Sequence, residues 1–449
     1  MLVAALLVTA ALEMAGLPQD LARVSGLVIF AIGFWAFGVL PEALTALTFL
    51  LGSVMLAGLS PATVFSGFTT TSFWLIFSGA LLSVCATRTG LSKWLSDRLF
   101  GPSFDRGSYG LRVALVVLFA SGLALVLPST LARVAILVPL VLALCDRLGH
   151  AKGSRGRTGL VLAAAIGTYV VPTTILPANL PNIILAGSLE GLYGIDLTFG
   201  SYMLLHFPVI GLIKGAGLVV ILAWLFADRP TVPAEAAAER APLSPEGKRL
   251  GVILAVTLGF WVTDIFHGIS PAWVGLTAAV VCLMPAARVA ALSDMPFNNI
   301  FPLMLYLGSV LAIGAVLTES GAGVVLSAAL VDRMPLTAAS DFVTLTMLAG
   351  LSAAVAVAAT MPASPALVAP LFGDIAAKAG WTIEAVGMSQ VLGYATPLLP
   401  YQLPPLMVAV AMTGVPMRDA LRVLLLLAAL TTLPMLLAAH LWWGTLGFY

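Results

Sequence analysis

The sequence predicts an all-α polytopic membrane protein, and three observations support this prediction. Hydrophobic residues make up 60% of the 449 residues and charged residues only 9%, whereas a soluble domain carries about 25% charged residues. Apolar runs long enough for a membrane-spanning helix of about 20 residues recur from residue 2 to residue 445. The chain also lacks the alternating segments of about ten residues that are typical of a membrane β-barrel. We therefore expect helices throughout.

A charged segment near the middle divides the chain into two parts. It reads ADRPTVPAEAAAERAPLSPEGKR at residues 227–249 and is rich in alanine and proline. Because the segment is too polar for a bilayer and carries basic residues, we expect a cytoplasmic linker there. The division predicts a first repeat at residues 1–226 and a second repeat at residues 250–449.

The two parts share polar and proline positions at constant spacing. Ser129 and Thr360 are 231 residues apart, and TTILPANLP at 173–181 matches TPLLPYQLP at 396–404 with a spacing of 223. Both segments follow the pattern T-x-x-L-P-x-[N/Q]-L-P. Internal repeats favour a transporter, often built from inverted repeats with its site where they meet. A duplicated scaffold without a transport role is the alternative.

Residues 111–146 have the pattern of a re-entrant helical hairpin. Basic residues flank both ends, and positive charge collects on the cytoplasmic side, so the chain leaves and returns to one side of the membrane. About 35 apolar residues are short for two crossings of about 20 residues each. The hairpin would have its tip at Pro128–Thr130, whereas two short spans would give the same parity.

The corresponding segment of the second repeat runs from 341 to 379, with its tip, TMPASP, at 360–365. Its flanks contain Asp341, Asp374 and Lys378 but no basic cluster. This difference places the second hairpin on the opposite side of the membrane, as inverted repeats require. We thus predict two opposed hairpins.

The first tip has the chemistry of an anion site. Broken backbone at membrane depth must be buried in protein or line a cavity, because each unpaired N–H or C=O group is costly. The helix after Pro128 presents free N–H groups and a positive dipole end, and Ser129 and Thr130 could cap it or contact a ligand. Arg133 suits a carboxylate or sulfate bidentately. Alternatively, Arg133 braces carbonyl groups of the tip or extends toward the interface.

A second broken element follows in each repeat, at about 172–187 and about 395–413. Prolines forbid a continuous helix in both segments, and amide and hydroxyl side chains lie between them, among them Asn179 and Gln402. The alternative is a pair of kinked helices whose hydroxyl groups bond back to the backbone. Repetition of the pattern in both parts favours a site.

These segments resemble the divalent anion–sodium symporter family of dicarboxylate and sulfate transporters, over nearly the whole chain. The similarity is carried by GFTTTSFWLIFSGALLSVCATRTGLSKWL at 67–95, LPSTLARVAILVP from Leu127, PTTILPANLPNIILAG from Pro172, TMPASPALVAP from Thr360 and YATPLLPYQLPP from Tyr394. The resemblance implies about 11 transmembrane helices and two opposed hairpins. It also implies a homodimer held by a scaffold domain, an elevator-like transport domain, and sodium as the coupling ion.

The resemblance also implies site residues, with departures at both tips. Ser129 holds the position of the family's tip serine, but Thr130 and Leu131 replace its asparagine and threonine, and Thr360, Met361 and Pro362 fill the second tip. Asn179 and Gln402 are possible replacements for the missing amides. The expected substrate-binding residues are Ser129, Thr130, Arg133, Asn179, Thr360, Ser364, Thr396, Pro397 and Gln402. The expected sodium ligands, largely backbone carbonyls, are Ser129, Thr130, Pro172, Thr173, Thr360, Ala363, Ser364 and Ala395.

We therefore expect a secondary transporter in the plasma (inner) membrane that moves a small anion, such as a di- or tricarboxylate, together with sodium. Neither tip has an acidic residue, which favours sodium over proton coupling. The alternative is a cation-independent anion exchanger or exporter, including one for sulfate-like oxyanions. An intramembrane enzyme is the distant alternative, because no histidine pair has H-x-x-x-H spacing and Ser129 has no base within a helical turn. We expect no cofactor beyond sodium and no nucleic-acid partner.

Overall fold

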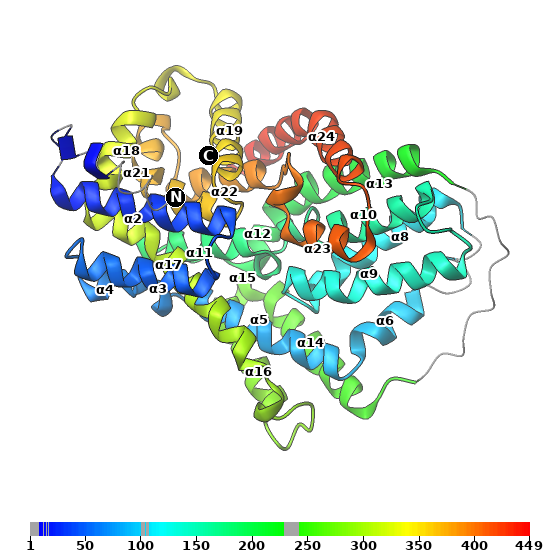
Figure 1. Cartoon of the computed structure of the whole chain (residues 1–449). Helices are drawn as coiled ribbons and strands as arrows, with labels where there is room; N and C mark the ends of the chain where they lie inside the picture. The colour runs from blue at the N-terminus through cyan, green and yellow to red at the C-terminus, as the bar shows by residue number, and fades with distance from the viewer. Residues whose placement is uncertain are drawn as a thin grey trace.

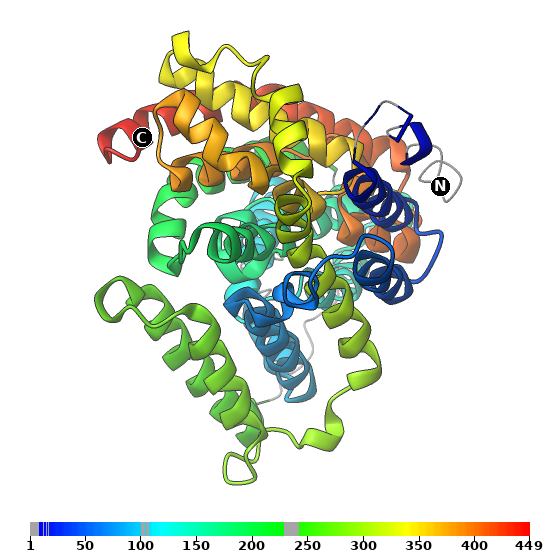
Figure 2. The same cartoon turned by 90° about the vertical axis from the view of Figure 1, so that its left-hand side faces the viewer.

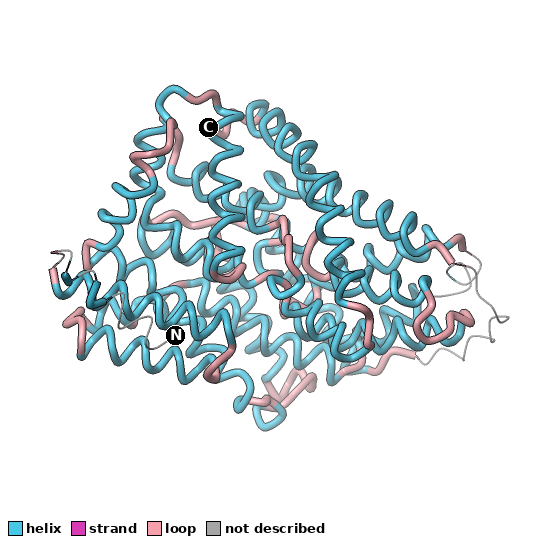
Figure 3. The backbone as a smooth tube through the Cα atoms, turned by 45° about the horizontal axis from the view of Figure 1, so that its top comes forward, coloured by secondary structure: helices cyan, strands magenta, loops and turns pink. Residues whose placement is uncertain are grey.

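The computed structural model describes residues 9–11, 13, 14, 16, 18–99, 104, 107–228 and 242–449. In these residues every regular element is a helix and no strand occurs (Figure 3). The prediction of an all-α protein is therefore confirmed. Figure 1 shows the helices stacked against one another along the whole length of the molecule.

The first part of the chain supplies helices on both sides of the molecule (Figure 1). In order they are α2 (Gln19–Phe37), α3 (Glu42–Met55), α4 (Pro61–Val64), α5 (Thr71–Arg88), α6 (Leu91–Leu99), α8 (Tyr109–Gly122), α9 (Thr130–Arg147), α10 (Arg155–Gly167), α11 (Leu180–Tyr193), α12 (Phe199–His206) and α13 (Leu212–Phe226). A π-turn at Phe207–Gly211 joins α12 to α13.

The second part repeats much of this order. It contains α14 (Pro245–Val262), α15 (Asp264–His267), α16 (Pro271–Leu283), α17 (Phe297–Glu319), α18 (Ala322–Leu330), α19 (Asp341–Ala358), α20 (Ala363–Val368), α21 (Phe372–Ala379), α22 (Ile383–Tyr394), α23 (Pro404–Thr413) and α24 (Met417–Thr445). Since α14 starts at Pro245, the end of the expected linker at 227–249 is helical, and its centre at 229–241 lies outside the described residues.

The helices are interrupted at both tips. α8 runs through the 3₁₀ turn Leu123–Leu125, and α9 starts at Thr130 after Pro128. The Ser129 hydroxyl caps α9 by accepting the Ala132 N–H at 3.3 Å. In the second part α19 ends at Ala358, and the Thr360 hydroxyl accepts the Ala363 N–H at 3.2 Å. The same hydroxyl cap thus starts both arms, 231 residues apart, because an N-cap oxygen satisfies an otherwise free amide.

The second broken elements also share one local structure. Two 3₁₀ turns, Pro172–Thr174 and Leu176–Ala178, separate α10 from α11, and the 3₁₀ turn Pro400–Gln402 separates α22 from α23. Proline at the first positions of these turns and helices explains the breaks, since it lacks the N–H that a continuous helix needs. That the repeats run in opposite directions through the membrane stays a prediction.

Many of these helices suit a bilayer. Five are long and apolar enough to cross one: α5, the α12–α13 helix from Phe199 to Phe226, α17, α19 and α24. Large apolar side chains such as Val252, Phe260 and Trp273 are exposed on α14 and α16, and such clusters mark a membrane or partner surface rather than a watery one. Together these features indicate a multi-pass membrane protein.

Two groups of helices face each other across the site. We call α2, α3, α5, α16 and α17 the α17 group, in which α3 packs on α2 and α17, and α5 on α16. We call α8, α9, α10, α13, α23 and α24 the α10 group, whose members pack around α10 and α13. In Figure 1, α2, α3 and α17 lie on the left and α8, α9, α10 and α13 on the right, with α11 between them and α5 and α16 below. Figure 2 views the molecule from its left-hand side.

Candidate functional site

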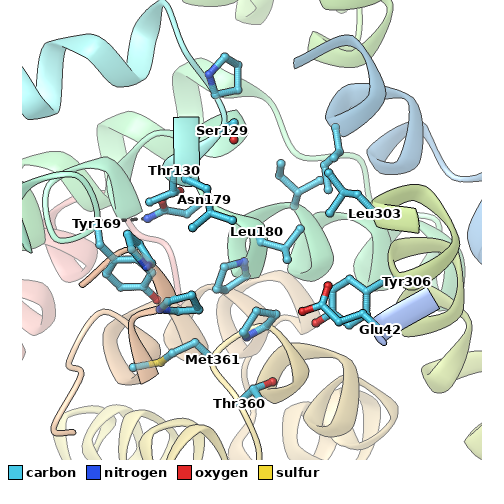
Figure 4. A pocket seen from close by; sticks show the side chains of 18 of the residues that line it. Glu42, Ser129, Thr130, Tyr169, Asn179, Leu180, Leu303, Tyr306, Thr360 and Met361 are labelled. Carbon is cyan, nitrogen blue, oxygen red and sulfur yellow. Dashed lines mark hydrogen bonds between the residues drawn. The ribbon is translucent and has the colours of Figure 1, made fainter. Parts of the chain in front are cut away.

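A cavity of about 350 Å³ lies between the α17 group and the broken elements of both halves. Figure 4 shows side chains from the first tip, the second tip and the α17 group pointing into the same space. Of the residues expected to bind substrate, it is lined by Ser129, Thr130, Asn179, Thr360 and Gln402. Segments that are more than 200 residues apart in the sequence therefore meet at one site.

The first tip presents unpaired donors to this cavity. The N–H groups of Thr130 and Leu131 open α9, and within the described residues neither donates to a protein group. Both residues line the cavity. The free amides at the start of an 18-residue helix favour a negatively charged group.

Gln402 supplies a further free donor. Its Oε1 accepts the Leu398 and Leu399 N–H groups, each at 2.8 Å, which fixes the amide plane. Its Nε2 is buried and has no partner among the described residues. A buried unpaired N–H group is costly unless a ligand or an ordered water satisfies it, so we expect one of the two to reach this amide.

Arg133 does not line the cavity, which corrects the prediction that it contacts the anion. Its Nη1 donates to the Leu127 and Pro128 carbonyls at 2.6 and 2.9 Å, and its Nη2 to the Thr168 and Ala178 carbonyls at 2.9 Å each. The side chain is fully buried. The guanidinium therefore braces the carbonyl groups of the first tip and of the α10–α11 break, the alternative role considered above.

Asn179 is likewise used within the protein. Its Oδ1 accepts from the Thr130 hydroxyl at 3.0 Å and from Arg133 at 3.2 Å. Its Nδ2 donates to the Tyr169 carbonyl and to the Thr173 hydroxyl, each at 3.0 Å. Asn179 thus joins the first tip to the α10–α11 break, and Gln402 rather than Asn179 has the amide donor left for a ligand.

Three further expected substrate residues, Ser364, Thr396 and Pro397, do not line the cavity either. The Ser364 hydroxyl donates to the Ser352 carbonyl on α19 at 3.0 Å. The Thr396 hydroxyl donates to the Leu392 carbonyl at 3.0 Å and accepts a hydrogen bond from Lys214. The Ser364 and Thr396 hydroxyls are thus used within the protein. Direct substrate contact of all three residues stays a prediction.

Sequence reasoning missed Lys214. This lysine is fully buried on α13, one turn after the π-turn, and its Nζ donates to the Thr396 hydroxyl at 2.8 Å. It makes no ion pair among the described residues. A lysine inside an apolar membrane helix is by default functional, and this signal was readable in GLIKGAGLVV. Its ammonium lies beside the loop that joins α22 to Gln402.

Tyrosines tie the two halves together beneath the site. The Tyr169 hydroxyl donates to the Tyr394 carbonyl at 3.1 Å, and the Tyr202 hydroxyl donates to the Thr173 carbonyl at 3.0 Å. The hydroxyls of Tyr202 and Tyr394 lie 3.4 Å apart. The break of the first half is thereby linked directly to the break of the second.

The opposite wall comes from the α17 group. Glu42 at the start of α3 and Tyr306 on α17 lie side by side there, across from Ser129 and Thr130 (Figure 4). Within the described lining, Glu42 is the only charged residue. The remaining lining is largely apolar: Trp35, Ile76, Leu131, Leu180, Ile183, Leu303, Met361 and several prolines.

Sodium binding at the first break stays a prediction, and several carbonyl oxygens there already have protein partners. The carbonyl oxygens that gather there accept hydrogen bonds from Arg133. The Thr173 carbonyl accepts from Asn182 and Tyr202. The carbonyl oxygens that Arg133 engages belong to Leu127, Pro128, Thr168 and Ala178, which are not among the expected sodium ligands. The nearby guanidinium charge would oppose a cation at this break. Pro172, Ala363 and Ala395 are buried outside the cavity lining.

The sequence is similar to those of known bacterial membrane proteins. A membrane protein of Cupriavidus necator is 25% identical over 405 residues, which cover 85% of this chain and 76% of the relative. A protein of Haemophilus influenzae described as a transporter is 24% identical over 413 residues, covering 87% and 85% of the two chains.

The crystal structure of the YdaH transporter of Alcanivorax borkumensis has a similar fold. Its TM-score is 0.59 at 16% identity, with 86% of this chain and 88% of that chain covered. The family described as the sodium:sulfate symporter transmembrane region matches residues 1–449. Because the match spans the entire sequence, this chain belongs to the sodium:sulfate symporter family of membrane transporters.

Proposed function

We propose that this chain is a secondary transporter of a carboxylate-bearing organic anion, which binds in the cavity between the two tips and the α17 group. The unpartnered Nε2 of Gln402, which belongs to the same cavity as the free amides of α9, carries this proposal. Buried N–H donors without partners are suited to carboxylate oxygens. Membership of the sodium:sulfate symporter family supports an anionic solute.

Access would alternate by an elevator-like movement of the α10 group against the α17 group. The cavity is lined from both groups, so a relative displacement would expose it to one side of the membrane and then to the other. Dimerisation through the α17 group and residence in the inner membrane complete the proposal. These last features rest on the resemblance described above.

For coupling, the family description supports sodium symport, and two buried positive charges motivate cation-independent exchange as the alternative. Arg133 already occupies the carbonyl oxygens of the first break, and Lys214 places a second buried positive charge beside the second break. Fixed charges of this kind can balance an anion without a bound metal ion. A di- or tricarboxylate as the solute is the expectation from the resemblance alone.

Counterflow into proteoliposomes tests this proposal. Vesicles loaded with unlabelled succinate or hexanoate would receive the same labelled anion in sodium or in potassium buffer. We expect exchange of at least one anion, and rates that agree in the two buffers within about twofold would support the cation-independent alternative. Uptake that requires sodium would refute the exchange mechanism, and no counterflow of either anion would refute the carboxylate transporter itself.

Gln402→Glu tests the proposed donor with little change in shape. The carboxylate keeps an acceptor for the Leu398 and Leu399 N–H groups but replaces the free donor by a negative charge. We expect anion affinity to fall at least tenfold, or about 1.4 kcal/mol, while the unfolding temperature changes little. Binding would be followed by isothermal titration and stability by tryptophan fluorescence. Unchanged affinity in the folded variant would remove Gln402 from the site.

A further inference from the structure

The two ends of the cavity have different chemistry, and the difference bears on which anion fits. At the first tip the Thr130 and Leu131 N–H groups have no protein partner, and Gln402, whose Nε2 also has none, lines the same cavity. No lysine, arginine or histidine occurs among the described lining residues. This donor set matches one carboxylate group, whose two oxygens accept several N–H groups.

The far end of the cavity suits a solute group that donates hydrogen bonds rather than a second carboxylate. There the carboxylate of Glu42 lies next to Tyr306, on the wall facing Ser129 and Thr130 (Figure 4). No hydrogen bond or ion pair engages the Glu42 side chain within the described residues, although its backbone carbonyl accepts from Trp35. A second carboxylate arriving there would meet a like charge at the edge of an apolar cavity, where screening is weaker than in water.

The walls between the two ends are apolar. Leu180 and Leu303 lie there in Figure 4, and Ile76 and Ile183 also line the cavity. A compact dianion would leave these surfaces facing water, whereas an extended hydrocarbon segment would cover them. Burial of apolar surface contributes about 25 cal/mol per Å² to the free energy of binding. The walls therefore favour a solute whose middle part is apolar.

We infer that the cavity takes an amphipathic molecule with one carboxylate, an apolar middle, and an ammonium or other strong hydrogen-bond donor at its far end. The carboxylate contacts the α9 amides and Gln402, and the far donor contacts Glu42. This inference rests on the proposed function, because it assumes the same cavity and the same carboxylate end. With an ammonium group the solute would be a zwitterion, so the carboxylate end of the proposed solute is kept but its net negative charge is not. Glu42 would then determine specificity in two ways: it attracts the donor at the far end of the solute and repels a second carboxylate.

Three acids of equal chain length separate these requirements: hexanoate, 6-aminohexanoate and adipate. They differ only at the far end, which carries a methyl group, an ammonium group or a second carboxylate. For the purified full chain we expect 6-aminohexanoate to bind at least tenfold more tightly than adipate, with hexanoate between them. Binding would be measured by isothermal titration and by competition with the labelled anion in counterflow.

Substitution of Glu42 should reverse this order. Glu42→Gln should bring adipate within about threefold of 6-aminohexanoate, and Glu42→Lys should make adipate the tightest ligand by about tenfold. Glu246→Gln on α14, outside the cavity lining, is the matched control and should leave the order unchanged. Glu42 starts α3 and its side chain caps no amide, so both variants should fold.

The outcomes distinguish this inference from the function on which it rests. Adipate binding tightest to the unaltered protein, or an order that the Glu42 variants do not alter, would overturn the selection by Glu42 and leave a carboxylate transporter. Failure of all three acids to bind would count against the carboxylate site itself. The expected reversal would establish both.

Discussion

Arg133→Met is expected to lower the unfolding temperature by about 5–10 °C and to abolish transport. The guanidinium satisfies the carbonyl groups of Leu127, Pro128, Thr168 and Ala178. Methionine fills a similar volume but donates nothing, so these buried acceptors lose their partners at about 1–3 kcal/mol each where water cannot replace them. Unfolding followed by tryptophan fluorescence in detergent would measure the effect.

Two further variants show whether the hydrogen-bond geometry is responsible. Arg133→Lys keeps the charge but loses the planar fork, so it should fall between the unaltered protein and Arg133→Met. Arg418→Met, at an exposed position on α24, removes an arginine without orphaning a buried carbonyl and should have almost no effect. An unfolding temperature of Arg133→Met equal to that of the unaltered protein would contradict the bracing role.

Lys214→Met should impair transport while the unfolding temperature stays the same or rises, unlike in Arg133→Met. Removing a buried, unpaired ammonium eliminates its desolvation cost, and its one hydrogen bond, to Thr396, is a small loss. The ammonium nonetheless lies beside the α22–α23 break that leads to Gln402, and buried charge acts strongly in a low dielectric. We expect the KM for counterflow to rise about tenfold.

The readouts separate a functional from a structural lysine. If Lys214 only held the fold together, Lys214→Met would unfold earlier, and the protein that remained folded would transport with a normal KM. Lys248→Met, which removes an exposed lysine from α14, should change neither the unfolding temperature nor the KM. A normal KM for Lys214→Met would assign the lysine no part in anion binding.

Much of the fold could be predicted from the sequence because its determinants are local. Proline removes a donor wherever it stands, so the interruptions near Pro128, Pro177 and Pro400 follow from the residues themselves. Ser129 was recognisable as a cap residue for the same reason. The overall composition sufficed for an all-helical membrane protein.

The site was less predictable, because the direction of a side chain depends on packing between distant segments. Arg133 could reach a ligand or its own tip, and the position of the Thr168 and Ala178 carbonyls decides between these possibilities. Asn179 and Gln402 occupy corresponding places in the repeat, yet only Gln402 keeps a free donor. Glu42 and Lys214 belong to no motif, and their proximity to the breaks exists only in the folded chain.

The tyrosine links between the halves limit how the solute can be released. Tyr169 and Tyr202 link one break to the other by hydrogen bonds, so separating these two segments would cost about 1 kcal/mol for each bond broken. Release without separating them is therefore favoured. A relative that accepts a longer or bulkier cargo would have to gain room elsewhere, at α3 and α17. Family members that transport different solutes should accordingly differ in the residues around positions 35, 42, 303 and 306.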